Sequence, residues 1–210
     1  MNKLLTLTSF CICFTASLYA SELILENGTD PVTEERYGKL AWDYGDSSTK
    51  GATVDAREMG GPEEGPYLSL RLYSIYKTGF FSKKIESDLL DFQEGRVSFR
   101  FAILNDEGAV KTLRVAFVKD TGVFDELGVN IADLPPADGG NRWRRLEVQL
   151  REGKIQEDGA TIDGVPIKIT LTSDARYDGA FLREVVWKVS KESRTKNIEV
   201  GIADMKISHP

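Results

Sequence analysis

The sequence contains one histidine and two cysteines among its 210 residues. The histidine, His209, is the penultimate residue, and chain ends are seldom held firmly. Both cysteines, Cys11 and Cys13, lie within the first twenty residues. A Ser-His-Asp triad, a thiol nucleophile and a Cys/His zinc site each need these residue types inside the folded domain. Their scarcity therefore excludes all three kinds of site from residues 21–208.

Long apolar runs and sustained helical periods are also scarce. No stretch after residue 20 is apolar for long enough to span a bilayer, and none keeps a helical period over three turns. The best helical candidate is 82–92, where Ile85, Leu89 and Phe92 predict one short helix.

The first twenty residues read "MNKLLTLTSFCICFTASLYA". A lysine, an apolar run and a small residue at Ala20 form the pattern of a secretory signal peptide. A membrane anchor is the alternative, but threonine and serine interrupt the run, which is also short for a span. We expect cleavage after Ala20 and a secreted, periplasmic or cell-surface protein. Residues 21–210 then form one domain without a disulfide, which its core must hold together.

The charge balance is acidic. The full chain has a formal net charge of −6. Removing the signal segment removes one lysine, which leaves 26 basic against 33 acidic residues and a net charge of −7. This balance favours solubility and argues against general nucleic-acid binding.

The dominant hydrophobic period is two. Apolar and polar residues alternate in seven runs, at 67–74, 96–103, 113–118, 144–150, 166–172, 185–190 and 197–202. Weaker runs occupy 22–26, 39–44 and 52–56. Such runs predict strands buried on one face, and clusters of Gly, Pro, Asn and Asp separate them as turns. Many one-faced strands without helices predict an all-β fold, a two-sheet antiparallel β-sandwich.

The order of these runs resembles the galactose-binding-like jelly roll of many carbohydrate-binding modules. The matching pieces are "LILENG", "GPYLSLRLYS", "LLDFQEGRVSFRFAI", "RWRRLEVQL" and "NIEVGIADMKIS". The resemblance covers most of residues 22–208 and implies a jelly-roll fold with a carbohydrate ligand. Two features depart from the family pattern. The loops at 74–94 and 152–164 are long, and the opening Asn-Gly lacks the acidic-aromatic pair that usually follows it.

The last predicted strand breaks its own alternation. Ile202 is even-numbered, whereas Met205 is odd-numbered, which predicts a β-bulge at Asp204. The resemblance implies that an acidic residue here helps to bind a structural calcium with oxygens of the opening loop, which are those of Glu26 and Asn27 in this chain. Calcium prefers such mixed oxygen ligands. The alternative is an Asp204 carboxylate that accepts hydrogen bonds from backbone N–H groups. Either arrangement would tie the last strand to the opening loop.

Four outward positions are candidates for ligand binding: Arg71, Tyr73, Arg100 and Arg114. If their strands are neighbours in one sheet, arginines lie beside a tyrosine on the face away from the core. Guanidinium groups bind carboxylate and sulfate oxygens, and aromatic rings stack on sugars, so this face would suit an acidic glycan. The alternative is solvent-facing charge paired with acids such as Glu147.

Trp143 heads the run at 144–150 and has the outward parity of that run. It is either an anchor in the core or at the rim, because large aromatic residues are mostly buried, or a platform for a ligand. The anchor is the preferred interpretation. The run "IYKTGFF" adds Tyr76, Phe80 and Phe81 in a predicted loop. We expect these three to fold under the sandwich, because exposing them is unfavourable.

Paired carboxylates are the catalytic option that this composition leaves open, since glycosidases need only two acids. The candidates are Asp120, Asp125, Glu126, Glu157, Asp158 and Asp163. All are predicted in polar loops, and no spacing singles out a pair.

The sequence thus favours an exported carbohydrate-binding sandwich without catalytic activity, whose ligand is a polysaccharide or other glycan. One alternative is a secreted or surface structural module without a sugar ligand, and another is a small carbohydrate-active enzyme such as a polysaccharide lyase.

Overall fold

The computed structural model describes residues 22–30, 52–73, 77–85, 94–105, 109–119, 124–135, 142–151, 154–172, 182–192 and 196–208. Its strands are β1 (Glu22–Glu26), β2 (Ala52–Arg57), β3 (Tyr67–Leu72), β4 (Thr78–Lys84), β5 (Glu94–Asn105), β6 (Val110–Lys119), β7 (Phe124–Asn130), β8 (Arg144–Arg151), β9 (Lys154–Ile162), β10 (Val165–Pro166), β11 (Thr170–Thr172), β12 (Leu182–Lys191) and β13 (Ile198–Ser208). The predicted signal segment and the weak run at 39–44 lie outside the described residues.

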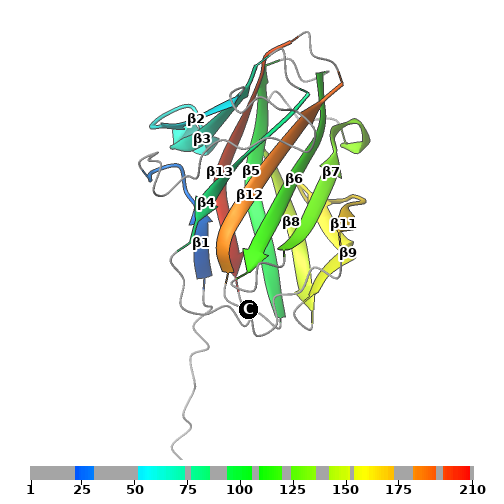
Figure 1. Cartoon of the computed structure of the whole chain (residues 1–210). Helices are drawn as coiled ribbons and strands as arrows, with labels where there is room; N and C mark the ends of the chain where they lie inside the picture. Colours follow the sequence, from blue (N-terminus) through cyan, green and yellow to red (C-terminus); the bar gives the residue numbers. More distant parts are fainter. Residues whose placement is uncertain are drawn as a thin grey trace, which may run out of the picture.

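The strands form two antiparallel sheets that pack face to face (Figure 1). Sheet A has the order β10-β9-β8-β5-β13-β3-β2, with β1 also paired to β13. Sheet B has the order β11-β7-β6-β12-β4. The predicted two-sheet sandwich is therefore confirmed. Among the described residues, no helix has the length and apolar composition needed to cross a bilayer.

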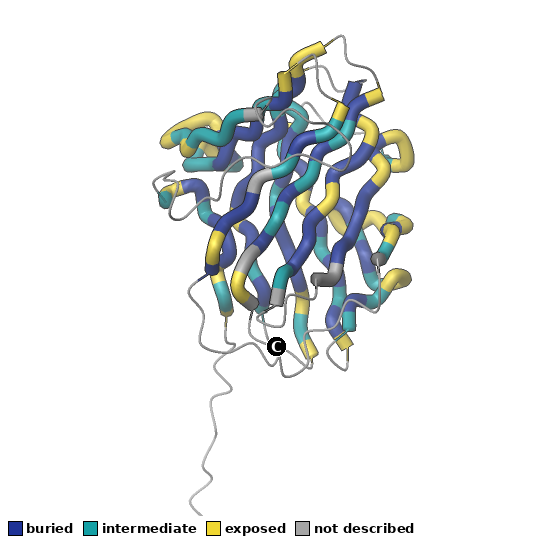
Figure 2. Tube along the Cα trace, in the orientation of Figure 1, coloured by how far each residue is buried: buried dark blue, intermediate teal, exposed yellow. Residues whose placement is uncertain are grey.

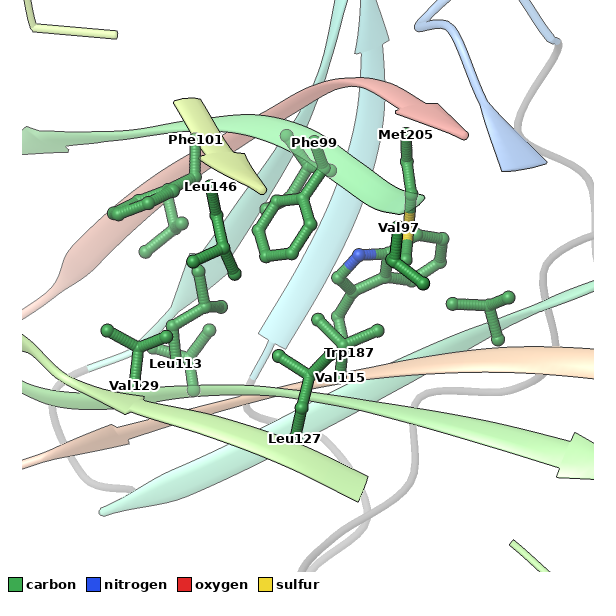
Figure 3. Packing of buried hydrophobic residues seen from close by; sticks show 14 of the residues in the cluster. Val97, Phe99, Phe101, Leu113, Val115, Leu127, Val129, Leu146, Trp187 and Met205 are labelled. Carbon is green, nitrogen blue, oxygen red and sulfur yellow. The ribbon is translucent and has the colours of Figure 1, made fainter. Parts of the chain in front are cut away.

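The core lies between the inner faces of the two sheets. Phe99, Phe101 and Leu146 of sheet A face Leu113 and Val115 of sheet B (Figure 3). The inner positions that the alternation predicted are almost all buried, whereas exposed residues collect at strand ends and turns (Figure 2). Each buried aliphatic or aromatic side chain contributes roughly 1.5–3 kcal/mol by leaving water, and this core replaces the disulfides that residues 21–210 lack.

The two ends of the described chain lie side by side in sheet A. Strand β1 pairs antiparallel with the last part of β13, and Leu23 lies opposite Ile207. The predicted β-bulge in β13 is confirmed, because its register against β5 shifts between Ala203 and Lys206. Asp204 lies in this shift with a φ of 50°, in the left-handed region.

Three strands were not expected from the sequence. Strands β4 and β9 occupy parts of the predicted loops at 74–94 and 152–164, and β7 was not predicted either. The short helix predicted from residue 82 is wrong at its start, because β4 continues to Lys84. Lys83 obscured this strand, because it fills an inward position where an apolar residue was expected.

The strand predicted over 166–172 is two short strands in different sheets. Asp163 and Gly164 have φ values of 51° and 80° in the turn that returns the chain from β9 to β10. Pro166 then ends β10 at the edge of sheet A, where the missing N–H is tolerated. The chain crosses to sheet B, where β11 pairs with β7.

Candidate functional site

The outer face of sheet A carries three of the four predicted ligand-binding residues, and both arginines among them are paired with acids. Arg71 Nε lies 3.3 Å from Glu199 Oε2. Arg100 Nη1 donates to Glu63 Oε1 at 3.2 Å, and its Nε lies 3.4 Å from Asp204 Oδ2. These pairs match the alternative of charge paired with acids.

Tyr73, the third of these residues, follows β3 and is 44% exposed. It is therefore accessible at the end of this strand. Its predicted role in ligand binding stays a prediction.

Trp143 covers the centre of the same face. Its ring lies over Gly201, which is opposite Ser69 on β3 and Ala102 on β5, and both of these small residues are buried. Trp143 Nε1 donates to the carbonyl of Gly60 at 3.2 Å, and a Cβ added at Gly201 would overlap the indole ring. The outward parity of Trp143 is therefore right. It is a half-buried anchor on the outer face and does not enter the core.

Tyr67 completes this cover. Its ring meets that of Trp143 edge to face, with centroids 5.3 Å apart, a favourable geometry for two aromatic rings. Burial raises the pKa of the Tyr67 hydroxyl, and the negative charge of Glu199 raises it further. The positive charges of Arg57 and Arg71 oppose this shift. The neutral hydroxyl is thus favoured over the phenolate.

The β-bulge opens a hollow of about 290 Å³ on the outer face of sheet A. Asn27, Arg100, Arg145, Asp204 and Lys206 are among the residues that line it. Two of the three calcium ligands that the resemblance implies, Asn27 and Asp204, therefore share one hollow. Among the described residues, no group of three or more histidine, cysteine, aspartate or glutamate side chains could hold a metal ion.

The third implied ligand, Glu26, faces the space between the sheets. Its Oε1 accepts a hydrogen bond from the Gly28 amide at 2.6 Å, and its Oε2 accepts one from Lys83 Nζ at 3.0 Å. Lys83 Nζ also donates to Asp30 Oδ2 at 2.5 Å. Because a buried ammonium already neutralises Glu26, the residues present do not fit one shared calcium site in this arrangement. Calcium binding stays a prediction for solution measurement.

On the outer face of sheet B, one carboxylate lies between two cations. Glu126 on β7 is 3% exposed. Its Oε1 accepts a hydrogen bond from Arg114 Nη1 at 2.9 Å, and its Oε2 accepts one from Lys188 Nζ at 2.8 Å. The prediction that Glu126 lies in a solvated loop is therefore wrong, because two neighbouring strands supply the cations that make its burial possible.

Asp163 is likewise engaged. Its Oδ2 accepts a hydrogen bond from Arg144 Nε at 2.6 Å, and its Oδ1 accepts one from the Arg145 amide at 2.8 Å. Glu157 and Asp158 lie on β9 with exposed side chains, so they too are strand residues. Asp120 and the side chain of Asp125 lie outside what the structure describes.

A hollow of about 420 Å³ lies on sheet B where β4 and β6 begin and β12 ends. Its basic lining residues are Lys77, Lys111, Arg114, Lys188 and Lys191. Glu192 is its one acidic lining residue among those that the structure describes, and Thr78, Thr112 and Ser190 supply hydroxyls. The hollow is therefore strongly cationic in a chain whose net charge is negative.

The structure separates the four predicted ligand-binding residues. Arg71 and Arg100 belong to sheet A and Tyr73 directly follows its strand β3, whereas Arg114 belongs to sheet B, so the four do not share one face. Phe80, predicted in a loop, is half-buried on β4 and pairs with Lys188. Tyr76 and the side chain of Phe81 lie outside the described residues.

The lysines of the cationic hollow were not predicted from the sequence. The predicted strand at 185–190 already placed Lys188 and Ser190 on its outward side. The information that the sequence lacked was the pairing of β12 with β6 and β4, which brings Lys111 and Lys77 beside them.

Comparison with known proteins identifies the fold. No protein-family model matches the chain, and no curated protein sequence matches it. Among solved structures, an exo-β-agarase matches with a TM-score of 0.60 and 11% identity over 89% of this chain and 25% of its own. The agarase AgWH50C matches with a TM-score of 0.54 and 11% identity over 90% of this chain and 24% of its own. The chain thus spans about a quarter of the length of these agarases.

A carbohydrate-binding module of family 27 from Caldicellulosiruptor saccharolyticus, solved in complex with mannohexaose, is also similar. Its TM-score is 0.49 and its identity 11%, over 89% of this chain and 96% of the module. The two agarases, whose TM-scores exceed 0.5, show a likeness of fold alone. At such identities, ligand and activity have to be argued from this chain's own residues.

Proposed function

We propose that this protein is an exported, non-catalytic carbohydrate-binding module and that its ligand is an acidic glycan. The single observation that carries the proposal is the cationic hollow on sheet B. Five basic side chains and one acidic side chain line it, although acidic residues outnumber basic ones in the whole chain. A local cluster against the net charge focuses the field on one place and draws anionic ligands there.

The hollow also offers the chemistry that a sugar needs. Three hydroxyls, those of Thr78, Thr112 and Ser190, lie among the cations. Hydroxyl groups both donate and accept, so they match the hydroxyls of a saccharide, while the cations match its acidic substituents. The volume of about 420 Å³ lies within the range of ligand pockets.

The described carboxylates support binding over catalysis. A glycosidase needs one carboxylate with a freely exchanging proton and a second across the sugar. Glu126 is occupied by two cations, and Asp163 is occupied by Arg144 and a backbone amide. Glu126 and Asp163 are therefore engaged in ion pairs, whereas Glu157 and Asp158 are exposed on β9.

A glycan array with the protein from residue 21 tests the proposal. Retention of acidic glycans, with neutral glycans of the same backbone unbound, is the expected result. Replacing Arg114 by glutamine should weaken binding, whereas the matched replacement of Arg151, exposed on sheet A, should leave it unchanged. Silence across the array would favour an interaction module without a sugar ligand, and release of products from a polymer would establish an enzyme.

A further inference from the structure

We infer that the hollow on sheet B recognises a sulfate ester on the saccharide and not a carboxylate. The inference rests on the proposed function and makes its ligand more specific. It follows from which cations line the hollow, which of them are already engaged, and where the hydroxyls lie.

One guanidinium group, that of Arg114, is among the described residues that line the hollow, and it is already engaged in an ion pair. Arg114 Nη1 donates to the buried carboxylate of Glu126, so part of its planar fork faces an internal acid. Planar carboxylates are bound best by a complete guanidinium fork that gives two parallel hydrogen bonds. The remaining cations are ammonium groups, which act as point charges and do not select a planar partner.

Lys77 and Lys111 are the ammonium groups that a ligand can reach. Both side chains are exposed, and with the described residues neither makes an ion pair. Lys188 lies deeper, against Glu126. Lys191 is 3% exposed and donates to the carbonyls of Tyr73 at 2.8 Å and Lys196 at 2.6 Å, so it forms part of the wall.

A row of hydroxyls crosses the same hollow. Thr112 on β6 lies opposite Ser190 on β12, and Ser190 lies opposite Thr78 on β4. The hydroxyls of Thr112 and Ser190 hydrogen-bond to each other. Three neighbouring strands thus present hydroxyls in a line, with Lys111 next to one end and Lys77 next to the other along the chain.

This arrangement suits a tetrahedral oxyanion. A sulfate ester has three terminal oxygens that point in different directions and need donors from several sides. Ammonium groups at the two ends supply such donors, together with the Thr78 hydroxyl and the one O–H that the hydrogen-bonded Thr112 and Ser190 pair leaves over. A carboxylate has two oxygens in one plane. A phosphate ester shares the tetrahedral shape but carries more charge, and a separate probe distinguishes it.

Four polymers with one backbone test the inference: dextran sulfate, carboxymethyl-dextran and dextran phosphate at matched charge density, and uncharged dextran. We expect titration calorimetry at about 0.15 M salt to show dextran sulfate binding at least about tenfold tighter than carboxymethyl-dextran, and uncharged dextran not binding. Equal or tighter binding of carboxymethyl-dextran overturns the inference but leaves an acidic-glycan function standing. If dextran phosphate binds more tightly than dextran sulfate, the inference of a sulfate ester is wrong and the ligand group is a phosphate ester. Failure of all three charged polymers overturns both the inference and the function.

A charge-neutralising variant locates the site. The Lys77→Gln/Lys111→Gln double variant should bind dextran sulfate at least about tenfold more weakly, because both exposed ammonium groups are removed. Lys154→Gln, on β9 of sheet A, removes a like charge from the other sheet and should bind as the unaltered protein does. Unchanged urea unfolding shows that the double variant is folded. A folded double variant with unchanged affinity overturns the assignment to this hollow.

Discussion

On the outer face of sheet A, Arg71 and Arg100 lie against carboxylates, and Trp143 covers a floor of small residues. On the outer face of sheet B, the buried carboxylate of Glu126 contacts two cations. The exposed ammonium groups of Lys77 and Lys111 lie in a hollow with one acidic lining residue, Glu192, among the described residues. On sheet A, these charged side chains and the Trp143 ring make contacts within the protein, and these contacts stabilise the sheet. The outer face of sheet B keeps a surplus of positive charge. Exposed arginines can thus be engaged by neighbouring acids, as on sheet A, whereas sheet B keeps exposed ammonium groups.

The largest expected loss of stability comes from removing the Trp143 ring from the outer face of sheet A. Trp143→Ala removes a half-buried ring that packs on Tyr67 and Gly201 and bonds to the Gly60 carbonyl. It should destabilise the protein by about 2–3 kcal/mol, less than the loss of a fully buried tryptophan. Urea unfolding measures this. A variant that unfolds like the unaltered protein but loses its glycan would show that Trp143 is a ligand platform.

The next effect comes from removing the buried acid on the outer face of sheet B, Glu126. Glu126→Gln leaves Arg114 and Lys188 close together without their shared counter-charge. We expect a loss of about 2 kcal/mol, below the 3–5 kcal/mol of a fully buried pair, because both cations keep contact with water. The same change raises the positive charge of the hollow, so the affinity for a polyanion should rise. Calorimetry of unfolding and of binding measures both, and weaker polyanion binding would contradict the comparison.

A smaller effect is expected at the bulge of sheet A. Asp204→Ala removes a partly exposed ion pair with Arg100 and places alanine in the left-handed region, at a cost of about 1–2 kcal/mol.

Substitution of Asp204 also tests whether the protein binds calcium. If calcium binds, it stabilises only the folded protein, so a chelator should lower the melting temperature of the unaltered protein, and Asp204→Asn should abolish that response. If neither the chelator nor Asp204→Ala changes the melting temperature, the Asp204 carboxylate does not tie the last strand to the opening loop.

The smallest effect is a dependence of stability on alkaline pH. The pKa of Tyr67 is raised in the folded state, so the folded protein keeps a proton that the unfolded chain loses above its ordinary pKa of 10.0. The contribution of Tyr67 is therefore complete below pH 10 and is lost as the pH rises toward the folded-state pKa. Urea unfolding between about pH 9 and pH 11 should show a steeper loss for the unaltered protein than for Tyr67→Phe. Equal slopes would contradict the shift.

The sequence predicted the fold better than the site, and particular residues show why. Strict alternation identified the strands around Phe99, Leu146 and Trp187, because each has one buried face. Strand β4 was not predicted because Lys83 occupies one of its inward positions. Its buried charge is neutralised by Glu26, which lies on another strand, β1. The partner of a charge is a property of sheet order, and the local pattern does not contain it.

The same limit applies to the candidate ligand residues. Outward parity was right for Arg71, Arg100 and Arg114, but parity does not say to which sheet a strand belongs. Strands β3 and β5 lie in sheet A and β6 lies in sheet B. The bulge at Asp204 was predictable because it breaks a local rule, and such breaks are visible in one sequence.

The pairing of β1 with β13 has a consequence for how the molecule forms. Glu22 lies opposite Ser208, so one ladder of sheet A joins residues from the two ends of the described chain. Contacts between residues so far apart in the sequence form late in folding. The chain first loses the entropy of closing a long loop, and the hydrogen bonds that compensate for this loss form only afterwards. Sheet A is therefore incomplete until synthesis has reached its last strand.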